Sequence, residues 1–383
     1  MKSKTESRGI IFVRNSDVRY DTRMRKAINE AIDCSLMPLV LGWIRDGGER
    51  PSVDQEVNGK PFSTKYFILK SRFGIGLSNI FRLIAFNMWL LKTLIATRKS
   101  YETIYVCDLD VSFSALLIKF LFRKKIIYDI FDFYSHTHAM PHVIRKYVEK
   151  AEYSVCRLSD SVIVCTEKRA KMLRDNTSIN SVVIYNTPNL EIMANKPDSL
   201  LSKTKGMFSI VYVGTLSETG RLLYEITEKI KVSHGIELHV AGLGPLEEYL
   251  AETIEDFPNI YFYGQVTNEV ALDLQAGADI LFATYDPSQE INRNSAPNKV
   301  YEAMALGKPI IVCQNTDADL VVTKNECGYA IGYDENEFMN VVYKYKNNED
   351  LRKEHSNNAL RLYHEKYSWS ICRERLKVVF SSI

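Results

Sequence analysis

A lysine and a glutamate near a helix start form the stretch of the sequence best suited to chemistry. The stretch spans residues 292–312 and has the sequence NRNSAPNKVYEAMALGKPIIV, in which a short helix is expected over 298–306. Lys299 and Glu302 are three residues apart, so they share one face of this helix. Free N–H groups at a helix start, together with a lysine, suit an anion such as a diphosphate. A carboxylate one turn further on can accept hydrogen bonds from a diol such as ribose.

The flanking residues define where this helix begins and ends. Ser295 suits the N-cap and Pro297 the first turn, while Gly307 suits the position just after the last turn. A buried strand is expected over 310–312. The same features also fit a capped surface helix with one Lys–Glu pair, and this alternative stays open.

Four strands expected in the second half each end in a glycine or another small residue. Because ligands of open α/β sheets bind at the carboxyl ends of strands, these four turns are expected to converge on a ligand. The strands are 208–213, 237–241, 260–263 and 279–283, and the residues that follow them are Gly214, Gly242, Gly264 and Thr284.

The first half also alternates short apolar strands with amphipathic helices, which predicts a parallel, doubly wound sheet. The polar segment 189–205 is expected to link the two halves. The strands are expected at 9–14, 39–43, 66–69, 104–107, 125–129, 161–165 and 182–185, and the helices at 22–32, 80–97, 111–122 and 149–158.

Composition narrows the class of protein. A chain of 383 residues suggests two domains. A net charge of +2 without a dominant basic run argues against a nucleic-acid binder. Seven scattered cysteines without CxxC spacing favour reduced core thiols of a cytosolic protein, and the N-terminus shows no signal-peptide pattern.

The apolar segment 80–97 is interrupted by Arg82, Asn87 and Lys92, which argues against a membrane-spanning helix. A helix that is apolar almost all round is usually buried in the core. Cations on its flanks leave a second interpretation open, in which this helix contacts the surface of a membrane with anionic lipids.

Two further motifs contain possible metal ligands. Asp108-Leu109-Asp110 resembles a metal-binding Asp-x-Asp, although Asp110 is explained more simply as a helix cap. His136, His138 and His142 form a second pattern, HTHAMPH, that could bind zinc with Asp132 or could supply one histidine as a hydrogen-bonding group. We expect no metal cofactor.

Several segments together resemble the retaining family-4 glycosyltransferases of the GT-B fold. In the second half these are IVYVGTLSETGRLL, ELHVAGLGPLEEYL, NIYFYGQVTNEVALDLQAGADILF and PNKVYEAMALGKPIIV, in the order and spacing of the family. In the first half YDTRMRKA, YDIFDFY, VEKAEYSVCRLSDSVIVCTE and VVIYNTPN are similar, as is YSWSICRERLKVVF near the C-terminus. The resemblance implies two Rossmann-like α/β domains facing a central cleft. It assigns 1–190 with the helix 368–383 to an acceptor-binding domain and 191–367 to a nucleotide-sugar-binding domain.

The resemblance also implies roles for residues of the donor side. Glu302 matches the glutamate that binds the ribose, and Val266 lies in the loop whose backbone meets the base. Gly214, Thr215 and Arg221 match the strand-end loop and the cation that face the diphosphate. Gly242, Asn294 and Asn298 complete the expected donor-binding set.

The sequence departs from the family pattern at several positions. Asn294 stands where the family often has a glutamate, with Glu290 nearby but out of register, which affects the expected contacts to the donor sugar. Thr215 follows Gly214 where an arginine is common, so Arg221 and Lys299 are expected to carry the charge of the diphosphate between them. Phe131 takes the place of a family histidine, so Asp132 or a nearby histidine is expected to meet the reacting groups.

On the acceptor side we expect Asp21 or Thr22 to cap the first helix, and Asp21, Arg23 and His136 to contact the acceptor. Arg23 and Arg25 are placed where they could touch a diphosphate or an acidic acceptor, although solvated helix charges explain them equally well. A solvated loop arginine is likewise the simpler alternative for Arg221.

The function expected from these features is metal-independent transfer of a sugar with retained configuration. The donor would be a UDP- or GDP-linked sugar, and the acceptor a glycan or lipid-linked molecule of surface polysaccharide synthesis. Arg221 and Lys299 are catalytic candidates because a leaving diphosphate needs cations where no metal serves. Asp132 is the third candidate, for contact with the reacting sugar or the acceptor. Two alternatives remain, a sugar-nucleotide epimerase or hydrolase of the same fold and a non-catalytic sugar-nucleotide-binding module.

Overall fold

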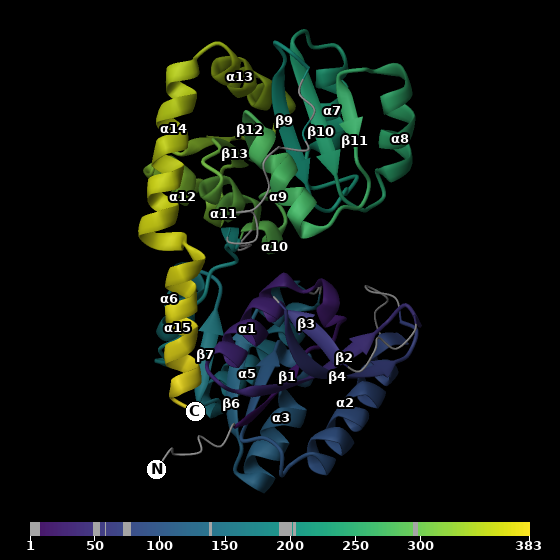
Figure 1. Cartoon of the computed structure of the whole chain (residues 1–383), viewed down its shortest axis with the longest axis vertical. Coiled ribbons are helices and arrows are strands. Elements are labelled where there is room, and N and C mark those ends of the chain that lie inside the picture. Colours follow the sequence, from purple (N-terminus) through teal and green to yellow (C-terminus); the bar gives the residue numbers. More distant parts are fainter. Residues whose placement is uncertain are drawn as a thin grey trace. The chain divides into compact units, whose positions relative to one another are not determined.

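The computed structural model describes residues 8–48, 54–57, 59–71, 78–137, 140–190, 201, 204–293 and 298–383. The chain divides into two compact units (Figure 1). The first unit contains residues 1–185 and 372–383, and the second contains residues 186–371. These boundaries lie a few residues from 190 and 368, the positions expected from the sequence.

The first unit is built on an eight-stranded sheet of order β3-β4-β2-β1-β5-β6-β7-β8. All neighbouring strands are parallel except β3, which pairs antiparallel with β4 at one edge. The strands are β1 (Gly9–Val13), β2 (Met37–Ile44), β3 (Asp54–Val57), β4 (Lys60–Ile68), β5 (Thr103–Cys107), β6 (Lys125–Ile130), β7 (Ser161–Val164) and β8 (Val182–Val183).

The helices of the first unit are divided between the two faces of the sheet. The connections β4–β5, β5–β6, β6–β7 and β7–β8 all advance in one direction, so right-handed crossovers put their helices on one face. The connection β1–β2 runs the other way, which puts α1 on the opposite face. The helices are η1 (Val18–Tyr20), α1 (Thr22–Asp33), α2 (Ser78–Ala96), α3 (Leu109–Phe122), α4 (Tyr134–Thr137), α5 (His142–Leu158) and α6 (Glu167–Thr177).

The second unit is built on a six-stranded, fully parallel sheet of order β11-β10-β9-β12-β13-β14. Its strands are β9 (Phe208–Val213), β10 (Ile236–Ala241), β11 (Ile260–Phe262), β12 (Ile280–Ala283), β13 (Ile310–Cys313) and β14 (Gly328–Ile331). Its helices are α7 (Leu223–Lys231), α8 (Glu247–Asp256), α9 (Asn268–Gly277), α10 (Glu290–Arg293), α11 (Asn298–Ala305), α12 (Asp317–Lys324), α13 (Glu335–Lys346), α14 (Glu349–Leu362) and η3 (Tyr363–Tyr367).

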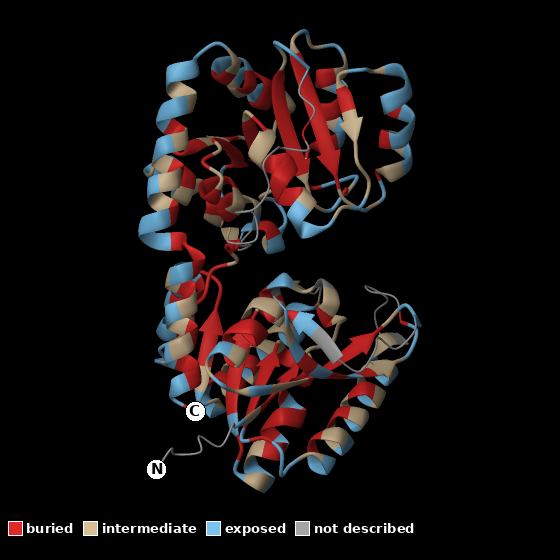
Figure 2. Cartoon of the chain, in the orientation of Figure 1, coloured by how far each residue is buried: buried red, intermediate tan, exposed pale blue. Residues whose placement is uncertain are grey.

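The central strands form the core of each unit because both faces of a parallel sheet are covered by helices. Every residue of β5 and every residue of β10 is buried. Figure 2 shows these strands buried and the outer sides of the helices exposed. Continuous apolar runs such as TIYVC therefore form strands without alternating polar residues. The C-terminal helix α15 (Trp369–Ser381) contributes its residues from Cys372 onward to the first unit.

The structure confirms the parallel α/β architecture and corrects several details. The strand expected at 66–69 begins at Lys60, and the antiparallel strand β3 before it was missed. The helix expected at 149–158 begins two turns earlier, at His142. Asp110 does not cap α3, because Asp108 occupies the N-cap position and its side chain makes no capping hydrogen bond. Ser295 and Pro297 lie outside the described residues.

Candidate functional site

The order of strands in the second unit has one switch point, between β9 and β12. From β9 the chain moves outward to β10 and β11, and from β12 it moves outward the other way to β13 and β14. The two connections diverge at this point and leave a crevice at the carboxyl ends of the strands, where ligands of open α/β sheets bind. The site is therefore expected among the residues that follow β9 and β12.

Hydrogen bonds join the turns at these strand ends. The N–H of Gly214 donates to the carbonyl of Ala241 at 2.9 Å, and the N–H of Gly242 donates to the carbonyl of Gly264 at 2.8 Å. The hydroxyl of Thr284 donates to the carbonyl of Arg221. The four turns expected to converge are thus held together, and the loop after β9 lies beside the loop after β12.

Two of these turns need glycine because other groups approach the backbone closely. Gly214 and Gly242 have φ values of 151° and 148°, which L side chains rarely adopt. A Cβ atom on Gly214 would lie 2.5 Å from Nζ of Lys299, and one on Gly242 would lie 1.8 Å from the carbonyl oxygen of Gly214. Gly214 therefore gives the Lys299 ammonium room beside the backbone of the turn.

The two cations predicted to bind the diphosphate meet at one aromatic ring. The guanidinium carbon of Arg221 lies 4.0 Å from the ring centroid of Tyr285. Nζ of Lys299 donates to the Tyr285 hydroxyl at 3.3 Å and lies 4.8 Å from the ring centroid of Tyr212. Because a positive group is attracted to the face of an aromatic ring, Tyr285 helps to hold both cations close together.

The surroundings of Lys299 keep it charged. Burial by itself lowers the pKa of Lys299, but interactions with Tyr212, Tyr285 and Glu302 outweigh that effect and raise the pKa above its usual value. Lys299 is therefore an ammonium ion at neutral pH. Its interaction with Glu302 is the one expected from their spacing on α11.

Buried neighbours fix the positions of the ring and of the arginine. Asn292 is 2% exposed, and its Oδ1 accepts a hydrogen bond from Nη1 of Arg221 at 3.1 Å. Its Nδ2 donates to the carbonyl of Asp286 at 3.0 Å, which ties Arg221 to the loop after β12. The hydroxyl of Tyr212 donates to the carbonyl of Thr215 at 2.8 Å, so the turn after β9 is also braced.

The other expected donor-binding residues are placed as follows. Thr215 and Asn298 are exposed, while Val266 and Glu302 are half-buried. Asn298 is the first residue of α11 and Glu302 lies one turn further on. Asn294 lies outside the described residues.

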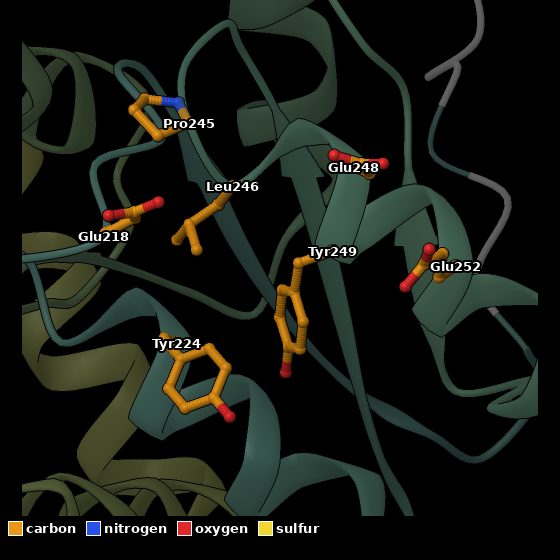
Figure 3. Close-up of a pocket in the computed structure, with 7 residues that line it drawn as sticks. All are labelled: Glu218, Tyr224, Pro245, Leu246, Glu248, Tyr249 and Glu252. Carbon is orange, nitrogen blue, oxygen red and sulfur yellow. The ribbon is translucent and has the colours of Figure 1, made fainter.

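A hollow of about 490 Å³ elsewhere in the second unit does not suit a diphosphate. Tyr224 and Tyr249 contribute aromatic rings to it, and Glu218, Glu248 and Glu252 contribute carboxylates (Figure 3). Pro245 and Leu246 complete its lining, which includes no lysine or arginine. Three carboxylates would repel a phosphate group.

In the first unit, Asp21 and Arg23 make well-defined structural contacts. Asp21 is the N-cap of α1, as expected, and accepts a hydrogen bond from the Met24 N–H at 2.9 Å. Arg23 is buried, and its Nε and Nη2 donate to the two carboxylate oxygens of Asp129 at 3.0 and 2.7 Å. This bidentate pair directs the Arg23 guanidinium toward the interior of the unit. The placement does not support the predicted contact between Arg23 and the acceptor.

The switch point of the first unit, between β1 and β5, carries an ion pair. Arg14, which follows β1, pairs with Asp108, which follows β5. The Arg14 guanidinium carbon lies 4.1 Å from the ring centroid of Phe131. Burial raises the pKa of Asp108 to about 6 despite the opposing effect of Arg14. Asp132 pairs with Nη2 of the buried Arg169 at 2.5 Å and remains half exposed.

The structure leaves most side chains of the histidine pattern outside the described residues. It pairs the two carboxylates of the Asp-x-Asp with Arg14 and Asn15. The side chain of His136 and all of His138 lie outside the described residues. Across the part of the chain that the structure describes, no three His, Cys, Asp or Glu side chains are grouped so that they could hold a metal ion.

Sequence reasoning missed three residues that contact the two cations: Tyr212, Tyr285 and Asn292. Tyr285 comes two residues after β12, so the rule that ligands bind at strand ends could have identified it. Tyr212 lies within a buried strand and Asn292 in a short helix. No pattern in the sequence indicates that these two side chains reach the same cations.

Comparison of the sequence with family models found one match, in the second unit. Residues 208–348 match the model described as Glycosyl transferases group 1. The match covers β9 to α13 and so includes the switch point, Arg221, Tyr285 and Lys299. A search of curated proteins found no match.

The whole chain is similar to several solved structures. Sucrose-phosphate synthase from Thermosynechococcus elongatus aligns with a TM-score of 0.71 at 15% identity, covering 98% of each chain. HepE of Anabaena in complex with UDP aligns with a TM-score of 0.68 at 14% identity, covering 98% of this chain and 100% of that one. WaaG, a glycosyltransferase involved in lipopolysaccharide biosynthesis, aligns with a TM-score of 0.62 at 14% identity, covering 97% and 99%.

These structural likenesses show the fold, which is GT-B with two parallel-sheet α/β domains. The domain match at 208–348 supports a glycosyltransferase.

Proposed function

We propose that the protein is a retaining glycosyltransferase that moves a hexosyl group from a UDP- or GDP-linked sugar to a glycan or lipid-linked acceptor. The observation that carries the proposal is the meeting of Arg221 and Lys299 at the ring of Tyr285, beside the Gly214 turn. Two cations held at one ring could both contact a bound diphosphate and balance its negative charge. The complex of HepE with UDP supports a uridine nucleotide as the first donor to test.

The chemistry assigned to these residues is stabilisation of the leaving group. When the bond between the sugar and the diphosphate breaks, negative charge grows on the departing phosphate oxygen. Arg221 and Lys299 are already positioned to neutralise it, so little reorganisation is needed as the reaction proceeds. The N-terminal turn of α11 adds partial positive charge, and Glu302 is assigned to the ribose hydroxyls. In this mechanism no metal cofactor takes part.

Asp132 is half exposed and remains our candidate for contact with the reacting sugar or the acceptor. We assign the enzyme to surface polysaccharide synthesis of the capsule or O-antigen type. We place it in the cytoplasm, with peripheral contact to the membrane through residues 80–97.

The experiment that tests the proposal is a donor screen followed by a release assay. Thermal shifts are measured with UDP-, GDP- and ADP-sugars, and release of free nucleotide is then measured with and without acceptor glycans. Acceptor-dependent release is expected. Release without any acceptor would indicate an epimerase or hydrolase instead, and binding without turnover would indicate a sugar-nucleotide-binding module.

The ribose assignment has a test of its own. Glu302→Ala is expected to abolish the thermal shift caused by the nucleotide, because the variant loses the acceptor for the ribose hydroxyls. Glu349→Ala changes an exposed glutamate of α14 and serves as the control. An unchanged shift in Glu302→Ala would remove the ribose assignment and leave the assignment of the two cations intact.

A further inference from the structure

Helix α2 has two apolar sides, and the first unit covers only one of them. Phe86, Leu90 and Leu94 are fully buried, and the ring of Phe86 stacks against that of Trp43 at 5.2 Å. On the other side Phe81 is 78% exposed, and Ile84 and Met88 are each more than half exposed. The window 79–96 is long and apolar enough to cross a membrane. The buried side nevertheless ties the helix to the unit, which favours a helix lying on a surface over one that crosses it.

Helix α3 repeats this arrangement. Val111, Ala115 and Ile118 are fully buried under the sheet. Phe113, Leu117, Phe120 and Leu121 are exposed, Phe120 to 63%. These four positions follow the spacing i, i+4, i+7 and i+8, so they form one stripe along the helix.

Helix α3 lies beside the second half of α2 and runs in the same direction. In the middle of α2 and near the start of α3, Nδ2 of Asn87 donates to the carbonyl of Asp110 at 3.0 Å, and the hydroxyl of Ser114 donates to Oδ1 of Asn87 at 2.6 Å. Near their last turns, the guanidinium of Arg98 lies 5.8 Å from the ring centroid of Phe122. Both helices are on the same face of the sheet (Figure 1), and their outer sides carry exposed residues (Figure 2).

Most charges beside these stripes are positive, the exposed Glu102 beside Lys124 being an exception. Exposed cations occur within α2 and just after both helices, at Lys92, Arg98, Lys99 and Arg123. No aspartate or glutamate occurs between residues 78 and 101, and in 109–125 the only one is Asp110, at the start of α3. Helix C-termini carry partial negative charge that these cations complement, but the excess of lysine and arginine remains available to an anionic partner.

We propose that the exposed apolar stripes of α2 and α3, with Lys92, Arg98, Lys99 and Arg123, form one lipid-contacting surface for an anionic bilayer. We call it the α2–α3 surface. It extends the contact with anionic lipids expected through 80–97 to a second helix, with named residues on both. Large exposed apolar residues beside lysine and arginine fit the boundary between acyl chains and anionic headgroups. Lysine is depleted at protein–protein interfaces, so a protein partner fits this composition less well.

The test measures binding of the full chain to sedimented vesicles, without donor or acceptor. The inference rests on the membrane contact of the proposed function, and this design separates its failure from a failure of sugar transfer. Vesicles of phosphatidylcholine alone are compared with vesicles that also contain phosphatidylglycerol. Binding to the anionic vesicles is expected. The double variant Phe81→Ser/Phe120→Ser should reduce the partition coefficient by at least about tenfold, since two bulky apolar groups no longer enter the bilayer.

Two further variants complete the design. Lys92→Gln/Lys99→Gln should reduce binding to the anionic vesicles by about tenfold or more, and should leave binding to phosphatidylcholine unchanged. Val232→Ser removes an apolar residue of the second unit that is 77% exposed, and should bind like the unchanged protein. Melting temperatures identify any variant that fails to fold.

Three results would overturn the proposal. One is no binding of the unchanged protein to anionic vesicles. A second is equal binding by Phe81→Ser/Phe120→Ser and Val232→Ser. The third is a concentration-dependent dimer, seen by light scattering, that the two phenylalanine substitutions abolish, because the surface would then be a contact between copies of the chain.

Discussion

At the scale of single residues, Tyr285 is the contact that Arg221 and Lys299 share. Arg221 and Lys299 both approach Tyr285, and the ring and hydroxyl of this tyrosine offset part of the cost of bringing two positive charges together. In the proposed function a bound diphosphate balances both positive charges.

Loss of either cation should be seen in turnover. Lys299→Ala and Arg221→Ala are each expected to reduce kcat by about 100- to 1,000-fold, because removing one electrostatic donor costs about 2.7–4 kcal/mol in barrier height. Lys353→Ala, which changes an exposed lysine of α14, is the control and should leave kcat unchanged. Steady-state nucleotide release checks this, and a loss below threefold in both site variants would contradict the assignment.

Tyr285 can be separated into its ring and its hydroxyl. Tyr285→Phe keeps the ring under Arg221 and loses only the hydrogen bond from Lys299, so a loss of about tenfold or less in kcat/KM is expected. Tyr285→Leu loses both contacts and should cost clearly more. Equal activity of the two variants would show that the ring has no part in holding Arg221.

At the scale of elements, a buried carboxyl group joins α5 to the rest of the first unit. Glu152 is fully buried and accepts hydrogen bonds from the hydroxyl of Tyr128 at 3.2 Å and from the N–H of Tyr134 at 3.2 Å. The contacts connect the helix to β6 and to the start of α4. Burial raises the pKa of Glu152 to about 8, although both hydrogen bonds act in the opposite direction.

Stability should therefore fall as pH rises. Above about pH 5 the unfolded chain loses the proton of Glu152, whereas the folded chain keeps it until about pH 8. In that window this group lowers the free energy of unfolding by up to about 1.4 kcal/mol per pH unit. Glu152→Gln should show a flatter profile of melting temperature between pH 5 and 8. Parallel profiles for the two proteins would contradict the raised pKa.

The turn after β9 offers a test of geometry. Gly214→Ala places a methyl group 2.5 Å from Nζ of Lys299, which the flexible lysine can avoid by moving away, and adds backbone strain at a φ of 151°. We expect the nucleotide-induced thermal shift to be lost and the melting temperature of the free protein to drop by only a few degrees. Gly59→Ala is a control at a turn where an added Cβ has no neighbour within 4 Å. A normal nucleotide shift in Gly214→Ala would argue against a role for this turn.

At the scale of the whole molecule, the two ends of the sequence meet in the first unit. Nε of Arg373, in α15, donates to the fully buried carboxylate of Glu30 in α1 at 2.9 Å. Nη1 of Arg375 donates to the carbonyl of Val183 at 2.8 Å. The ring of Phe380 packs 6.5 Å from that of Phe12, in the first strand. The first unit therefore needs the last residues of the chain to complete its core.

Removal of one of these contacts should lower global stability. Arg373→Ala leaves the buried Glu30 carboxylate without its cation and should cost about 1–3 kcal/mol of unfolding free energy. Glu374→Ala changes the next residue of the helix, whose side chain is 70% exposed, and is the control. Urea unfolding with both variants checks this. An equal effect of the two substitutions would show that the Arg373–Glu30 pair contributes nothing.

The sequence alone was sufficient where local rules decide the structure. The strand at 208–213 was predicted with the bounds the structure has, because an uninterrupted apolar run that stops at a glycine has few alternatives. Lys299 and Glu302 were assigned to one face of α11 because their spacing allows nothing else. Asp110 was wrongly predicted as a cap, because the N-cap position falls on Asp108, whose carboxylate pairs with the distant Arg14. The strand β3 was missed because an edge strand depends on a partner strand that local patterns do not reveal.

What the sequence determined by itself is most of the strands along the chain, the glycine turns and the types of the two cations. Only the tertiary structure decided that Arg221 and Lys299 share Tyr285 as a neighbour. Tyr212, Tyr285 and Asn292 lie in different segments, and the crossovers of the parallel sheet bring those segments to one switch point. Local periodicity reports which face of an element is buried. It carries no information on which side chain from a distant strand will lie against it, because that contact is set by the order of the strands in the sheet.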